Sequence, residues 1–380
     1  MKKALYFDYA SATPQSDAVT AAMQPYFKDI YYNPSALYLA AKKTKKTIDD
    51  FRSQAADCLQ VRPSEVFFMA GSTEANNTVI HGILATHKNA HIVISAIEHE
   101  SVIAAARQYN HTLAPVLSTG IINLPKLEKS ITSTTVLISC MAANNELGTV
   151  QPISEVAKLV QDVLQKRRDQ GNELPLYLHV DASQSFNYMA LLPHQQGIDF
   201  AVVSGSKIYG PKQTALLYKK ASIPLQPLIV GGGQEHGLRS GTENVAGIAG
   251  LTTAIVQAHA LRGSESKRLA TLRTTLVTQL TQLGGTINGS LVHRLPSNIH
   301  VTFAGIDNEL LVMQLDEAGC MVATGSACSA SSDLPSHVLK AIGLSDAAAQ
   351  SSIRITLGRD TTTASCEYLI KTLTAILRRS

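Results

Sequence analysis

The sequence has no long apolar run, no closely spaced pair of cysteines and little excess charge of either sign. No segment approaches the roughly 18 consecutive apolar residues of a membrane-spanning helix, so no membrane association is expected. The five cysteines (Cys58, Cys140, Cys320, Cys328 and Cys366) are scattered, which indicates neither a disulfide framework nor a metal site. The net charge of +4 is too small and too dispersed to predict direct nucleic-acid binding.

The remaining composition is that of an ordinary globular protein. Of 380 residues, 45% are apolar and 16% are charged, which suits a large core and excludes a disordered chain. An acidic residue, Asp8, interrupts the first segment before any signal-like apolar run, so a cytoplasmic location is expected. The compact basic cluster from Lys42 to Lys46 is interpreted as a solvated helix face, with an RNA or acidic partner as the lesser alternative.

Short apolar runs alternate with amphipathic segments in the part of the chain that ends near Tyr218. This alternation predicts an α/β fold with a largely parallel sheet covered by helices on both faces. The predicted helices include 74–84 and 153–166. The predicted strands are 65–69, 91–95, 135–139, 177–180, 200–203 and 215–218.

The pattern changes after Thr242. Residues 245–283 are rich in Ala, Leu and Gln and predict one or two long helices that lead into a second domain. Beyond them, predicted strands at 297–303 and 351–357 alternate with predicted helices at 308–319 and 363–378. This order indicates a smaller α+β domain.

Asp181 directly follows the predicted strand 177–180, and three residues separate Lys207 from the end of the predicted strand 200–203. Ligands of such sheets bind beyond the carboxyl ends of the strands. A lysine amine and an aspartate carboxylate are the groups that pyridoxal phosphate requires, as Schiff-base partner and as partner of the pyridine nitrogen. The pair alone is weak evidence, because either residue is more often a turn former or a solvated charge.

Further polar residues follow the other predicted strands. Ser72 and Thr73 follow a glycine at the start of a predicted helix, where they can bind a phosphate or simply cap the helix. His99 can stack on a planar cofactor and exchange protons, or be an ordinary loop residue. Asn145 and Gln184 offer uncharged hydrogen bonds but are also common in turns.

Two features later in the chain suggest what such a cofactor would act on. Cys328 lies in a run of small residues, Ala323-Thr-Gly-Ser-Ala-Cys-Ser-Ala-Ser331, which predicts an exposed, mobile thiol suited to nucleophilic attack. Arg354 and Arg359 frame a predicted strand of the second domain. Either guanidinium can grip an amino-acid carboxylate, although a surface ion pair is the default role.

Taken together, these motifs resemble the NifS/IscS-type cysteine desulfurases, which are fold type I pyridoxal phosphate enzymes of aminotransferase class V. The resemblance runs from Tyr6 to about Arg359, and several motifs in the same order are more specific than any one of them. The motifs are Asn144-Asn-Glu-Leu-Gly148, His179-Val-Asp-Ala-Ser-Gln184, Ser204-Gly-Ser-Lys-Ile-Tyr-Gly-Pro211, Gly237-Leu-Arg-Ser-Gly-Thr242, Gly325-Ser-Ala-Cys328 and Ser351-Ser-Ile-Arg-Ile-Thr-Leu-Gly-Arg359.

The resemblance implies a fold and a division into domains. A large cofactor-binding domain with a mostly parallel seven-stranded sheet would span residues 14–257. A smaller α+β domain would comprise residues 1–13 and 258–380 and would carry the mobile catalytic cysteine loop. The family relation also implies a homodimer.

The resemblance also assigns roles to residues. Lys207 would form the Schiff base with pyridoxal 5'-phosphate, Asp181 would bind the pyridine nitrogen, and His99 would stack on the ring. Cys328 would take the substrate sulfur as a persulfide. The other implied contacts are Gln184 with the cofactor phenolate; Asn145 with substrate or cofactor; Ser72, Thr73, Ser204, Ser206 and Thr242 of a second subunit with the phosphate; and Arg354 and Asn33 with the substrate carboxylate.

The implied reaction converts L-cysteine to L-alanine and passes sulfur to an acceptor protein, either a tRNA thiolation enzyme or an iron–sulfur scaffold. The short segment after the last predicted helix favours the former. Two positions depart from the family pattern, which has histidine where Ser206 stands and a histidine shortly after Asn33-Pro-Ser, where this chain has Ala36-Leu-Tyr38. The alternatives are a selenocysteine lyase, another class V enzyme, or a sulfur-relay protein with low turnover.

Overall fold

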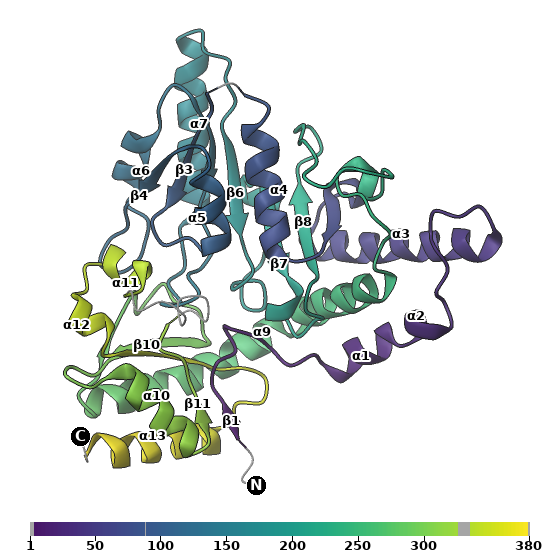
Figure 1. Ribbon diagram of the computed structural model, residues 1–380. Helices are drawn as coiled ribbons and strands as arrows, with labels where there is room; N and C mark the ends of the chain where they lie inside the picture. The colour runs from purple at the N-terminus through teal and green to yellow at the C-terminus, as the bar shows by residue number, and fades with distance from the viewer. Residues whose placement is uncertain (1–3, 88, 326–334, 379–380) are drawn as a thin grey trace.

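The computed structural model describes residues 4–87, 89–325 and 335–378. Its largest sheet has seven strands in the order β2-β8-β7-β6-β5-β3-β4 (Figure 1). In this sheet, β8 runs in the opposite direction to the other six strands. The strands are β2 (Val66–Met69), β3 (His91–Ser95), β4 (Asn110–Ala114), β5 (Thr135–Ser139), β6 (Tyr177–Asp181), β7 (Phe200–Ser204) and β8 (Ala215–Lys219). The predicted α/β fold with a mostly parallel seven-stranded sheet is confirmed.

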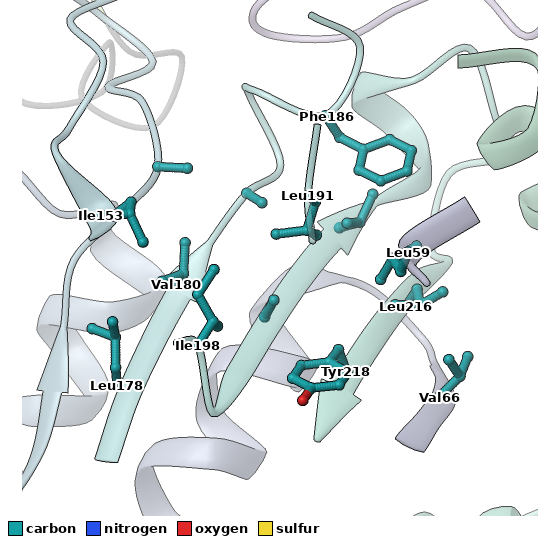
Figure 2. Packing of buried hydrophobic residues seen from close by; sticks show 14 of the residues in the cluster. Leu59, Val66, Ile153, Leu178, Val180, Phe186, Leu191, Ile198, Leu216 and Tyr218 are labelled. Carbon is teal, nitrogen blue, oxygen red and sulfur yellow. The ribbon is translucent and has the colours of Figure 1, made fainter. Parts of the chain in front are cut away.

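Strands in the middle of this sheet are buried on both faces. Alternate residues of one strand therefore belong to different cores: Val203 of β7 faces one cluster and Val202 the other. The first cluster lies between the sheet and the helices α3 (Leu39–Leu59), α7 (Ile153–Asp169) and α9 (Val245–Gln282). Figure 2 shows part of it around Leu178, Phe186 and Leu216. The second cluster lies under α4 (Ser72–Leu84) and α5 (Glu100–Ala106).

One strand of the sheet escapes the sequence prediction. β4 has the sequence Asn-His-Thr-Leu-Ala and is partly exposed along most of its length, because it lies at the edge of the sheet. A half-exposed edge strand does not need the continuous apolar run of a central parallel strand. A search for short apolar runs in the sequence therefore does not find β4.

A second layer lies at one end of the large sheet. Its three-stranded antiparallel sheet has the order β12-β10-β9, and β1 pairs in parallel with β11 beside it. Helices α10 and α13 pack on this layer through a third apolar cluster. The bounds are β1 (Leu5–Tyr6), β9 (Thr286–Ile287), β10 (Asn298–Thr302), β11 (Cys320–Met321), β12 (Ser352–Thr356), α10 (Asn308–Glu317) and α13 (Thr363–Leu377).

The α9 helix joins the two layers. The predicted one or two helices form a single helix of 38 residues. Its first half contributes Ile248 and Leu251 to the first cluster, and its second half contributes Leu276 and Leu280 to the third. This change of core suits the expected small domain, whose boundaries at residues 13/14 and 257/258 stay a prediction.

The remaining helices are short and lie on the surface or between the layers. In the described part of the chain, no helix is both long and apolar enough to cross a membrane. The remaining short helices are α1 (Asp17–Met23), α2 (Pro25–Lys28), η1 (Pro63–Glu65), α6 (Leu124–Ser130), α8 (Pro193–Gln196), η2 (Gly205–Lys207), η3 (Glu235–Gly237), α11 (His337–Ala341) and α12 (Asp346–Ala349).

We expect the Leu216→Ala substitution to lower the free energy of unfolding by about 2–5 kcal/mol, because it leaves a cavity in the first cluster. Leu216 is 0% exposed and points into that cluster (Figure 2). Urea unfolding of the cofactor-free protein measures the change. The control is Leu291→Ala at a side chain that is 62% exposed; equal losses in the two variants would contradict the packing argument.

Candidate cofactor and substrate site

A cavity of about 150 Å³ opens beyond the carboxyl ends of the central parallel strands. Seven of the residues predicted from sequence line it: Ser72, His99, Asn145, Asp181, Gln184, Lys207 and Arg354. They come from both layers and from positions as distant in the chain as Ser72 and Arg354. The fold therefore gathers most of the predicted constellation around one space.

Asp181 is the last residue of β6 and is 8% exposed. Its Oδ1 accepts the backbone N–H of Ser183 at 2.9 Å. Its Oδ2 accepts the side-chain amide of Asn76, on α4, at 2.8 Å. These two donors fix the orientation of the buried carboxylate.

Lys207 ends η2, the short 3₁₀ turn that follows β7. Its Nζ donates to the carbonyl of Ala10 at 2.9 Å and also to that of Ser11. Its backbone carbonyl accepts the side-chain amide of Asn187 at 2.7 Å. The amine is thus held at the cavity wall by the segment that follows β1.

Gln184 and His99 reach the same cavity from two other segments. Gln184 donates its amide to the Ala10 carbonyl at 2.9 Å, next to the Lys207 amine. His99 caps the amino terminus of α5, where its Nδ1 accepts the backbone N–H of Ser101 at 3.1 Å. Burial lowers the pKa of His99, so the imidazole is neutral near pH 7.

The amino terminus of α4 reaches the cavity through Ser72. Ser72 and Thr73 are in its first turn, after Gly71, which has a φ of +137° that side chains rarely allow. The free backbone N–H groups and dipole of a helix start attract anions. Ser204 and Ser206 provide neighbouring hydroxyls whose oxygens are 3.1 Å apart.

Arg354 lies on β12 and is 1% exposed. Its Nη2 donates to Asp8 Oδ1 at 2.7 Å and to Ser11 Oγ at 2.8 Å, while its Nη1 donates to the Asn145 carbonyl at 3.2 Å. The ion pair with Asp8 compensates the buried charge. Sequence reasoning missed Asp8, because its partner is 346 residues away.

Among the described residues, five predicted site residues do not line the cavity: Asn33, Thr73, Ser204, Ser206 and Thr242. Asn33 is exposed in the segment between α2 and α3, where its Oδ1 accepts the backbone N–H of Ser35. Thr242 is exposed too, although its loop is tied to the first turn of α4 by a 3.0 Å ion pair between Arg239 and Glu74. Cys328 lies outside the described residues. Their predicted roles stay predictions.

Glu98 is a further buried acid that sequence reasoning missed. It precedes His99 and is 0% exposed, and its Oε1 accepts the backbone N–H of Met141 at 2.6 Å. Its Oε2 has no hydrogen-bond partner among the described residues. Burial, with a smaller contribution from the charge of Asp181, raises the pKa of Glu98 to about 8.

Comparisons with known proteins agree with this geometry. The family model described as "Aminotransferase class-V" matches residues 5–369. The cysteine desulfurase IscS of Dictyoglomus turgidum is 36% identical over 389 aligned positions, covering 100% of this chain and 96% of the relative. The cysteine desulfurase IscS 1 of Archaeoglobus fulgidus is 35% identical, covering 98% of this chain and 97% of the relative.

Two solved structures extend the comparison to three dimensions. A NifS-like protein superposes with a TM-score of 0.91 at 32% identity and covers 99% of this chain and 100% of its own. SspA in complex with cysteine superposes with a TM-score of 0.80 at 33% identity and covers 93% of this chain and 98% of its own.

The chain therefore belongs to the aminotransferase class-V family. Within that family, the predicted resemblance to the NifS/IscS-type cysteine desulfurases is confirmed. Members of this kind are fold type I enzymes that depend on pyridoxal phosphate, so the predicted cofactor is confirmed as well. The donor set fits that cofactor: an amine, a buried carboxylate and an anion-binding helix start surround one cavity.

We expect Glu98→Gln to remove a pH dependence of stability. The folded chain keeps the Glu98 proton up to about pH 8, whereas the ordinary pKa is 4.5. Between these values the folded state binds more protons than the unfolded state, so Glu98 makes the protein less stable as pH rises. Below a pH of 4.5, Glu98 is protonated in both states, so it no longer makes the stability depend on pH.

Urea unfolding of the cofactor-free proteins across that window tests the expectation. The free energy of unfolding of the Glu98→Gln variant, relative to that of the unsubstituted protein, should increase as pH rises. The control is Glu100→Gln, because Glu100 is an exposed acid two positions further along the chain. A constant difference across the window would show that the Glu98 carboxyl is ionised in the fold.

Proposed function

We propose that this protein is a pyridoxal phosphate-dependent cysteine desulfurase that converts L-cysteine to L-alanine and receives the sulfur as a persulfide on Cys328. The observation that carries the proposal is the single cavity lined by Lys207, Asp181 and Arg354. An amine, a pyridine-binding carboxylate and a carboxylate-binding guanidinium together suit an amino-acid substrate. Relatives that match across the full length bear this activity in their names.

Several of the residues that would hold the cofactor line the cavity. Asp181 would bind the pyridine nitrogen, Gln184 the phenolate oxygen, and His99 the face of the ring. The start of α4 with Ser72 and Thr73, joined by Ser204 and Ser206, would hold the phosphate, with Thr242 of a second copy. When bound, the cofactor supplies an electron sink for the substrate carbon atoms.

The substrate would lie between Lys207 and Arg354. Arg354 lines the cavity, and its contacts with Asp8 and Asn145 fix the orientation of its guanidinium there. With Arg354, the Asn145 side chain and Asn33 would bind the substrate carboxylate. Lys207 can accept a proton from the substrate and return one to the carbon that becomes the methyl group of alanine.

The sulfur step requires no external oxidant or reductant. The Cβ–Sγ bond of L-cysteine breaks and a new S–S bond forms with the Cys328 sulfur. The carbon that loses sulfur gains a proton, so the products are L-alanine and a Cys328 persulfide. Sulfur then leaves when an acceptor thiolate attacks the outer sulfur atom.

Three finer assignments belong to the same proposal. We propose a homodimer, because Leu37, just before α3, is 87% exposed and Leu39, the first residue of α3, is 76% exposed, and exposed apolar side chains that lie together are typical of protein contacts. We propose a cytoplasmic location, supported by the unpaired cysteines of the described chain, Cys58, Cys140, Cys320 and Cys366. The proposed sulfur acceptor is a tRNA thiolation enzyme or an iron–sulfur scaffold protein.

Turnover of L-cysteine tests the function directly. With a thiol reductant present, the purified protein should release sulfide and L-alanine in equal amounts. Lys207→Ala and Cys328→Ala should each lower this rate by about 10³-fold or more, because each removes a group that reacts covalently.

The control for this experiment is Cys320→Ala, which removes a buried thiol away from the cavity. Its turnover should match the unsubstituted protein. A rate undiminished in Cys328→Ala would contradict the persulfide step. Absence of turnover in a protein whose visible absorbance shows bound cofactor would contradict the desulfurase function itself.

Arg354→Lys should raise the KM for L-cysteine by about 10- to 100-fold with a smaller change in kcat. Lysine keeps the charge but loses the planar pair of donors that grips a carboxylate. Steady-state kinetics separates the two parameters. The matched variant is Arg359→Lys, because the Arg359 guanidinium stacks on Tyr209 at 3.9 Å and does not line the cavity; an equal KM increase there would contradict the assignment.

A further inference from the structure

A continuous chain of hydrogen bonds joins Asp181 to His99 behind the cavity. The side-chain amide of Asn76 donates to Asp181 Oδ2 at 2.8 Å and to Ser101 Oγ at 2.9 Å. Ser101 Oγ in turn lies 2.9 Å from His99 Nδ1. The chain connects α4, α5 and the end of β6. It therefore couples the pyridine-binding carboxylate to the imidazole that would lie against the ring.

The direction of each bond in this chain follows from chemistry. Asn76 is 0% exposed, and the opposite rotation of its amide would place Oδ1 against the Asp181 carboxylate. The NH₂ group must therefore face Asp181 and Ser101. Because Ser101 Oγ accepts from Asn76, its own proton is available for His99 Nδ1.

The same contacts determine the tautomer of His99. Its Nδ1 also accepts the backbone N–H of Ser101 at 3.1 Å, so this nitrogen carries no proton. The proton of the neutral ring must lie on Nε2. Protonating Nδ1 would set its N–H against the backbone N–H of Ser101, so the two contacts oppose the imidazolium form.

The charges around His99 act on the same equilibrium. Burial lowers the pKa of His99; Asp181 and Glu100 raise this pKa, whereas Lys207 and His337 lower it. Burial is the largest of these effects. The electrostatic surroundings and the hydrogen bonds therefore favour the same neutral ring.

We propose that Asn76 and Ser101 are positioning residues that orient the Asp181 carboxylate and hold His99 as a neutral imidazole with its proton on Nε2. His99 then meets the cofactor as a hydrogen-bond donor and a stacking surface, and it does not act as a base. This inference rests on the proposed function and deepens it, because proton movement at the substrate falls to Lys207.

Nitrogen NMR of the cofactor-free protein with labelled histidine tests the tautomer, with His99→Gln assigning the signal. For His99, the expected spectrum shows an unprotonated Nδ1 and a protonated Nε2 near pH 7. Ser101→Ala should raise the pKa of His99 toward its ordinary value, because it removes one donor to Nδ1, and Ser101→Thr should restore it. A proton on Nδ1, or a His99 titration that Ser101→Ala does not shift, would overturn the proposal.

Cofactor affinity tests the Asp181 arm of the chain. Asn76→Asp preserves shape but places a second carboxylate against Asp181, so the Kd for pyridoxal phosphate should rise about 10- to 100-fold. Asn77→Asp adds the same charge at the next position of α4, where the native amide donates to the Thr73 and Ser101 carbonyls. Its Kd should change by less than about threefold; equal weakening in both variants would contradict the specific role of Asn76.

Both measurements are made without L-cysteine. A wild-type protein that binds the cofactor but releases no sulfide would contradict the proposed desulfurase and leave the Asn76 and Ser101 results standing. If Asn76→Asp fails to fold, the spectra of the unsubstituted protein and of the Ser101 variants still decide the inference.

Discussion

The site depends on the common direction of the parallel strands. Because β6 and β7 end at the same edge of the sheet, Asp181 and Lys207 meet although α8 and β7 separate them in the sequence. The second layer contributes Arg354 from β12. The segment after β1 connects the two sides: the Ala10 carbonyl holds Lys207 and Gln184, and Asp8 holds Arg354. A local change in this segment would disturb cofactor and substrate residues together.

Sequence reasoning predicted what is visible in local patterns. Strands that are buried along most of their length are mainly apolar, so β2, β3, β5, β6, β7 and β8 were predictable, whereas the polar edge strand β4 was not. Polar residues at strand ends pointed to Asp181 and Lys207. The side chains that hold them remained hidden, because Asn76 and Asp8 have roles only through partners in distant parts of the sequence.

Ser206 shows how the chain can depart from its family without losing the surrounding geometry. Its carbonyl accepts both the backbone N–H and the hydroxyl of Thr13 at 3.0 Å, contacts that any residue at this position can make. Its hydroxyl lies 3.1 Å from that of Ser204. The backbone next to Lys207 is therefore held by main-chain contacts. The Ser206 side chain is smaller than the imidazole of the family pattern.

The long α9 helix has a mechanical consequence. The helix passes from the large sheet to the small one (Figure 1). Its Ile248 belongs to the first cluster and its Leu276 to the third. Any tilt of the small sheet must bend this helix or slide one end through close-packed side chains, and both are costly. The helix therefore holds the layer that carries Arg354 in place beside the strand end that carries Asp181.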